Sequence, residues 1–124
     1  MTSTVSSLMP AHRVIECTHS GAVTAADMRT SAKGMRDLAE RDGVWNVLSD
    51  FTDATAVPRG TDMLAMMEQL QAAGVAAQLR HAMVWPSDMQ VRMAYEVWKT
   101  AEQNRGFHAQ AFYSRDEAIA WLDA

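Results

Sequence analysis

Short apolar segments alternate with amphipathic segments along this chain, and that alternation limits the fold more than any other feature of the sequence. Apolar runs of strand length occur at 12–18, 44–51, 80–85 and 107–113. A segment with apolar residues at three- and four-residue spacing, which is typical of a helix, follows each run. Strand and helix signals in this order predict parallel strands joined by right-handed crossovers. We therefore expect an α/β fold, with an open, mainly parallel sheet of four to five strands and helices packed on it.

The expected helices have recognisable first residues. Capping boxes, in which the first and fourth residues bond each other's backbone, are indicated at 24–27, 87–90 and 114–117. The remaining helix is expected to begin with Thr61 as its N-cap and Asp62 in its first turn, and to end before Gly74. The sequence thus predicts four principal helices, one after each strand.

The chain of 124 residues has the size of a single domain. Residues 1–11 are polar and rich in serine and threonine, so we expect a flexible N-terminal arm or a weak edge strand there. Residues 12–124 are expected to form one domain.

Composition argues against several classes of function. The net charge is −4, and the sequence has neither the basic surface expected of a nucleic-acid-binding protein nor a polybasic membrane anchor. No run of apolar residues reaches the length of a transmembrane helix. Cys17 is the only cysteine, which excludes a disulfide within the chain and favours a reducing compartment. We expect a cytoplasmic protein that binds neither nucleic acid nor membrane.

No familiar catalytic or metal-binding pattern occurs in the sequence. The spacings of zinc sites, the phosphate-binding loop, the dinucleotide-binding glycines and the nucleophile elbow are all absent. His81 and His108 fall at the amino ends of expected strands, whereas the binding groups of parallel sheets gather at the carboxyl ends. We predict structural histidines, an inert Cys17, no catalytic residue, no cofactor and no metal.

The carboxyl edge of the sheet is the predicted binding surface. Asp50 and Asp53 follow a strand there, and they are expected to bond local backbone as turn residues rather than to hold a cation. The connection at 52–60 is longer than most strand-to-helix loops, and long loops are often functional. The predicted binding edge consists of Asp50, Asp53, Arg59, Gly60, Thr61, Trp85 and Ser87.

A second apolar stripe marks the helix that begins near residue 87. Met89, Met93 and Val97 lie at four-residue spacing, beside the stripe that contains Tyr95 and Trp98. A helix that is apolar on two sides either lies in the centre of a protein or contacts another chain. We interpret Met89, Met93 and Val97 as a homodimer surface.

Three segments carry a resemblance to a known family. The segments at 20–24 (SGAVT), 47–53 (VLSDFTD) and 111–122 (AFYSRDEAIAWL) resemble, in the same order, landmarks of STAS-like, SpoIIAA-like domains. The resemblance spans nearly the whole chain, and it implies an α/β domain used for regulation by protein contact, as in anti-anti-sigma factors. The phosphorylated serine motif of those factors is missing, because residues 57–62 read VPRGTD, with Thr61 as the nearest hydroxyl.

These observations lead to three functional hypotheses. The first is a non-enzymatic, STAS-like regulatory or protein-interaction domain, a homodimer with an unidentified protein partner. The second is a carrier or sensor of small apolar molecules with a pocket near Trp85, because a related branch is similar to Sec14-type folds. The third is an enzyme whose site has no recognisable motif.

Overall fold

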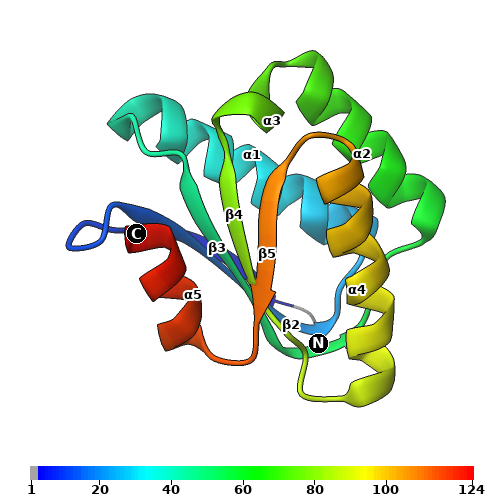
Figure 1. The fold of residues 1–124 in the computed structure, drawn as a ribbon. Helices are drawn as coiled ribbons and strands as arrows, with labels where there is room; N and C mark the ends of the chain where they lie inside the picture. The colour runs from blue at the N-terminus through cyan, green and yellow to red at the C-terminus, as the bar shows by residue number, and fades with distance from the viewer. Residues whose placement is uncertain (1–2) are drawn as a thin grey trace.

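In a computed structural model, which describes residues 3–124, the protein is a five-stranded sheet covered by helices (Figure 1). The strands lie in the order in which they occur along the chain, and β1 pairs antiparallel with β2 while all other pairs are parallel. The elements are β1 (Ser3–Met9), β2 (Val14–Ala22), α1 (Ala25–Asp42), β3 (Asn46–Ala56), α2 (Gly60–Ala72), α3 (Val75–Gln78), β4 (Arg80–Val84), α4 (Met89–Asn104), β5 (His108–Phe112) and α5 (Arg115–Asp123). The predicted α/β class and mainly parallel sheet are confirmed.

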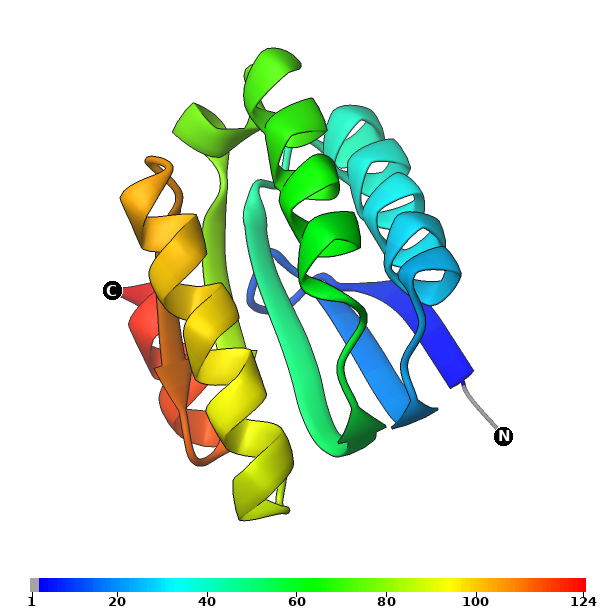
Figure 2. The same ribbon diagram turned by 90° about the vertical axis from the view of Figure 1, so that its right-hand side faces the viewer.

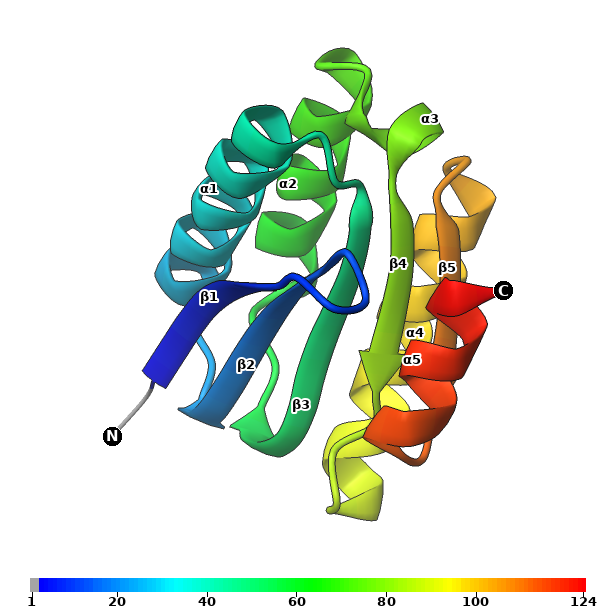
Figure 3. The same cartoon turned by 90° about the vertical axis from the view of Figure 1, so that its left-hand side faces the viewer.

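The strand order decides which face each helix covers. From β2 to β5 the chain always moves to the next strand in the same direction, so right-handed crossovers carry α1, α2 and α4 to the same face. Figure 2 shows these three helices side by side over the sheet, and Figure 3 shows α5 alone on the opposite face. The parallel strands therefore have no point at which their order reverses.

Alternate residues of each strand supply two separate cores. Odd-numbered strand residues such as Ile15, Val47 and Met83 face α1, α2 and α4. Even-numbered residues such as Leu48 and Ala82 pack against α5 in a smaller core. Within the described part of the chain, no helix is both long enough and apolar enough to cross a membrane.

Two strands are longer than the sequence predicts. β2 continues through the predicted turn at His19–Gly21, because irregular pairing with β3 and the positive φ of Gly21 (75°) keep the strands together. β3 likewise continues to Ala56 through Asp53, which pairs with Ser20. The predicted long loop at 52–60 is therefore wrong, since only residues 57–59 connect β3 to α2. Of the two alternatives for the N-terminal segment, the structure has the edge strand, β1.

The helix starts agree with the sequence in part. Thr24 and Asp27 form the predicted capping box, with both bonds present. The predicted N-cap Thr61 is wrong, because α2 begins at Gly60 after Arg59, which provides no side-chain cap. Ser87 is also not the N-cap of α4; the Asp88 side chain accepts from the amides of Gln90 and Val91 instead. The short helix α3 was not expected.

Replacing Thr24 with Ala should lower the free energy of unfolding by about 1 kcal/mol, because the Asp27 amide loses its acceptor at the start of α1. Urea unfolding of the variant measures this loss. Thr30→Ala, at an exposed position inside the same helix, is the matched control and should change stability by less than half of that. Equal effects of the two substitutions would contradict the role of the cap.

Candidate functional site

A pocket of about 60 Å³ lies between the sheet and the three helices on its larger covered face. Its floor is formed by alternate residues of β2, β3 and β4, and its walls by α1, α2 and α4. The lining residues are Cys17, His19, Met28, Ser31, Ala32, Met35, Val47, Ser49, Phe51, Met63, Met66, Leu70, Leu79, His81, Met83, Tyr95, Trp98 and Glu102.

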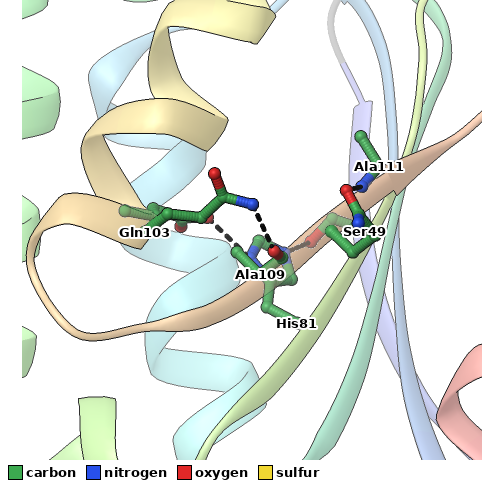
Figure 4. A network of polar contacts seen from close by, with 7 residues as sticks. Ser49, His81, Gln103, Ala109 and Ala111 are labelled. Carbon is green, nitrogen blue, oxygen red and sulfur yellow. Dashed lines mark hydrogen bonds and ion pairs between the residues drawn. The ribbon is translucent and has the colours of Figure 1, made fainter.

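A chain of hydrogen bonds crosses the floor of this pocket. Ser49 Oγ of β3 lies 2.7 Å from His81 Nε2 of β4, and His81 Nδ1 lies 3.1 Å from Glu102 Oε2 of α4. The Ser49 and His81 side chains point toward each other across the two strands (Figure 4). Ser49 is 6% exposed, and the His81 and Glu102 side chains are 12% and 13% exposed. We call Ser49, His81 and Glu102 the polar relay.

The direction of the bonds follows from the chemistry of the carboxylate. An ionised Glu102 can only accept, so its partner is the Nδ1–H of His81; in the neutral form of the ring, the Nε2 lone pair is then left to accept the Ser49 hydroxyl proton. A serine, a base and a group that orients the base thus follow one another. That order is the one found in hydroxyl nucleophiles activated by a neighbouring base.

A second histidine lies beside the relay. His19 of β2 is almost completely buried, and its ring stacks on Phe51 with the centroids 4.7 Å apart. Burial, with a smaller contribution from the charge of His81, lowers the pKa of His19 to about 4, although Asp27 and Asp50 oppose the shift. His19 is therefore neutral at pH 7.

Aromatic residues from the sheet and α4 form another part of the pocket. Phe51 packs against Tyr95 with the ring centroids 4.4 Å apart. The Tyr95 hydroxyl donates to the Ala56 carbonyl at 3.1 Å, and burial raises the pKa of this phenol, which keeps it protonated. Tyr95 thereby ties α4 to the end of β3.

Polar contacts also join α2 to α4 beside the pocket. Gln71 donates to the Arg105 carbonyl at 2.8 Å, and Arg105 lies 3.7 Å from the Glu68 carboxylate. These groups are largely exposed, so each contact stabilises the helix pair only slightly.

The lining favours an uncharged, mainly apolar ligand. Among the described lining residues, Glu102 is the only carboxylate and there is no lysine or arginine. A volume of about 60 Å³ holds about four water molecules, so a larger ligand needs side chains to move. The pocket contains Met28, Met35, Met63, Met66 and Met83. Methionine is flexible enough to move in this way, and its sulfur makes favourable contacts with aromatic rings.

The predicted binding edge is not where this pocket lies. Asp50 does bond local groups as expected, accepting from the Thr52 amide at 2.9 Å. Asp53, Arg59, Gly60, Thr61 and Ser87 are exposed. None of the residues of the predicted edge lines the pocket. Whether this edge binds a ligand or a partner stays a prediction. Carboxyl-end crevices open where strand order reverses, and this sheet has no such reversal among its parallel strands.

Trp85, which is part of the predicted binding edge, does not line this pocket. Its ring is buried and lies under Lys99, whose Nζ is 5.8 Å from the ring centroid. Its amide donates to the Phe112 carbonyl at 2.9 Å, so Trp85 joins β4 to β5. The pocket is instead lined by Trp98, on α4.

The stripe on α4 is exposed. Met89, Met93 and Val97 are 68%, 62% and 65% exposed, respectively, so they are not part of the core. Whether a second copy covers them stays a prediction.

Two further features bear on the chemistry of the site, namely clusters of metal-binding side chains and the cysteine. Across residues 3–124, no three side chains of His, Cys, Asp or Glu come together in a way that could hold a metal ion. Cys17 is a buried cysteine that lines the pocket and pairs in register with Ser49.

The polar relay was missed at the level of the sequence, although a signal for it was present. Ser49 and His81 occupy positions that alternate with apolar residues, which places them on the covered face. Glu102 follows Trp98 by four residues on the apolar stripe of α4. Polar side chains at buried positions need partners, so these three were candidates for one another.

Comparison with known proteins supports the fold assignment. No family model and no curated protein matches the sequence. The structure is similar to the crystal structure of an uncharacterized DUF3478-family protein with a SpoIIAA-like fold from Shewanella loihica PV-4. The TM-score is 0.68 at 14% identity, covering 98% of this chain and 95% of that one. The predicted STAS-like, SpoIIAA-like fold is thereby confirmed.

Acid should destabilise the protein partly through His19. Its folded-state pKa of about 4 lies below the unfolded value of 6.5, so the unfolded state binds the extra proton between these pH values. The neutral ring contributes its full stabilisation above pH 6.5. The free energy of unfolding should fall by about 3 kcal/mol between pH 6.5 and pH 4. Replacing His19 with Gln should reduce the pH dependence of the unfolding free energy by that amount.

The control for this measurement is His12→Gln, since His12 is exposed beside Asp123. Urea unfolding at pH 4, 5, 6 and 7 gives the slope for each variant. If His19→Gln and the wild type lose stability equally between pH 7 and pH 4, the buried neutral histidine is not the cause.

Proposed function

We propose that this SpoIIAA-like domain binds a small, uncharged, mainly apolar molecule in the pocket beneath α1, α2 and α4. The observation that carries the proposal is the pocket itself, with mainly apolar walls and the polar relay on its floor. Ligand sites commonly combine a largely apolar lining with a few polar groups that fix orientation. This proposal develops the second of the hypotheses drawn from the sequence.

The relay and the methionines narrow the ligand class. The Ser49 oxygen, whose proton bonds His81, can still accept a hydrogen bond from a ligand hydroxyl, whereas the Glu102 charge repels a carboxylate. Thioethers and aromatic rings on the walls suit an aromatic ring in the ligand. A neutral aromatic molecule with a single hydroxyl group fits all three conditions.

Methyl NMR of the methionines tests this proposal with two matched compounds. p-Cresol and p-toluate share a methyl-substituted ring but carry a hydroxyl and a carboxylate, respectively. p-Cresol should shift the methyl signals of the pocket methionines, including Met35 and Met83, and leave the exposed Met89 and Met93 unchanged. p-Toluate should cause no shifts at the same concentration. Shifts at Met89 and Met93 alone, or no shifts, would refute the pocket as the binding site.

Filling the pocket should abolish binding. Ser31 is buried on α1 and lines the pocket, so Ser31→Leu places a larger apolar side chain in the space for the ligand. We expect p-cresol affinity to fall at least about tenfold, with a stability change of about 1 kcal/mol or less because the cavity accepts the added volume. Thr30→Leu, at the exposed neighbouring position, is the control and should bind as the wild type does. Unchanged affinity in Ser31→Leu would contradict the proposed site.

We propose self-association as a second property, on the basis of the exposed stripe on α4. Two antiparallel α4 helices related by a two-fold axis at Met93 would bring Met89 against the partner's Val97, so the stripe is complementary to itself. This contact between two copies is the part of the first hypothesis, a homodimeric protein-interaction domain, that we propose here.

Met93→Glu should convert a dimer into a monomer, because it places two like charges together at the two-fold axis. Sedimentation at tens of micromolar measures the association, and thermal unfolding checks the fold. The position is exposed, so the monomer should keep its stability within about 0.5 kcal/mol. A wild-type protein that is already monomeric at this concentration would refute the proposal.

A further inference from the structure

The polar relay has more organisation than a buried serine in a strand requires. A single acceptor is enough to satisfy a serine hydroxyl. Here the acceptor is an imidazole, and a carboxylate from a third element, α4, holds its other nitrogen. Residues far apart in the sequence, on β3, β4 and α4, thus converge on one line of hydrogen bonds.

The relay also borders space that a second molecule can enter. Ser49, His81 and Glu102 all line the pocket, so all three residues border the volume in which we place a ligand. The Ser49–His81 distance of 2.7 Å lies within the range for proton transfer from a nucleophile to its base. The two features that define an activated hydroxyl, a base in contact and a site beside it, are both present.

We propose that Ser49 is a nucleophile that accepts an acyl group from a small uncharged ester, with His81 as its base and Glu102 as the positioning residue. The inference rests on the proposed function, because the ester must enter the same pocket. Ser49 Oγ adds to the ester carbonyl carbon while its proton passes to His81 Nε2. The carbon–oxygen bond to the alcohol then breaks, and the alcohol leaves with the proton from His81. Water attacks the acyl-serine by the same route in reverse, releasing the acid and restoring the hydroxyl.

The position of Ser49 predicts the kinetics. Ser49 lies inside β3, paired in register with Cys17 of β2 and Met83 of β4, so its backbone belongs to the sheet rather than to a free turn. Enzymes with exposed backbone amides at the nucleophile gain about 10²–10³ in rate from each oxyanion donor. Acyl transfer here therefore relies on the nucleophile and base. We expect one rapid acylation per chain followed by slow release.

The experiment uses p-nitrophenyl acetate, a small, neutral aromatic ester. Rapid mixing should give a burst of p-nitrophenol equal to the protein concentration, and the intact mass should rise by one acetyl group. Peptide mapping should place that group on Ser49. His108→Gln is the control for an exposed histidine and should retain the burst, and the peptide map distinguishes Ser49 from the neighbouring Cys17 thiol.

Three substitutions separate the roles in the relay. Ser49→Ala should remove the burst, and His81→Gln should slow acylation about 10²–10⁴-fold. Glu102→Gln should slow acylation while leaving p-cresol affinity, measured by the methionine methyl shifts, within about twofold. That split between rate and affinity distinguishes a positioning role from general damage to the pocket. Circular dichroism and p-cresol binding show whether Ser49→Ala remains folded.

The outcomes separate this inference from the proposed function. If p-cresol shifts the pocket methyl signals but no acetyl group appears on Ser49, the nucleophile is refuted and ligand binding stands. A burst that persists in Ser49→Ala, or an acetyl group on Cys17 or a surface lysine, also overturns the inference. If p-cresol does not bind and the ester does not react, both proposals fail.

Discussion

The order of the strands is the constraint on which the rest of the structure depends. Because the chain moves from β2 to β5 without reversing direction, its right-handed crossovers stack α1, α2 and α4 on the same face. A sheet of this kind has no crevice at a reversal point, where doubly wound sheets bind ligands. The pocket proposed here lies instead in the layer between the sheet and its helices.

The covered face of a sheet usually carries apolar side chains. If the odd-numbered strand residues were all apolar, the layer between the sheet and its helices would be too. Instead, His19, Ser49 and His81 interrupt the apolar floor. Burying polar groups is costly unless they form hydrogen bonds, and Glu102 completes the bonds of His81 from the helix above. The relay is thus held by elements from two layers, and this attachment fixes the His81 ring relative to Ser49.

The fold could be predicted because local patterns determine it, whereas the site could not. Thr24 and Asp27, which lie within four residues of each other, mark the start of α1, and short apolar runs predict the strands. The relay joins positions 49, 81 and 102, and their proximity depends on strand register and on the face that α4 covers. Neither is fixed by local sequence. The rule that placed binding groups at the carboxyl edge also assumed a reversal of strand order that this sheet lacks.

The protonation state of the His81 ring tests the central claim most directly, because the claim depends on which nitrogen carries the proton. Long-range ¹H–¹⁵N NMR of histidine-labelled protein reports Nδ1 and Nε2 separately. At neutral pH we expect a protonated Nδ1 and an unprotonated Nε2, with the Nε2 signal moving in Ser49→Ala and the tautomer changing in Glu102→Gln. A ring protonated at Nε2 alone, or one indifferent to both substitutions, would contradict the polar relay.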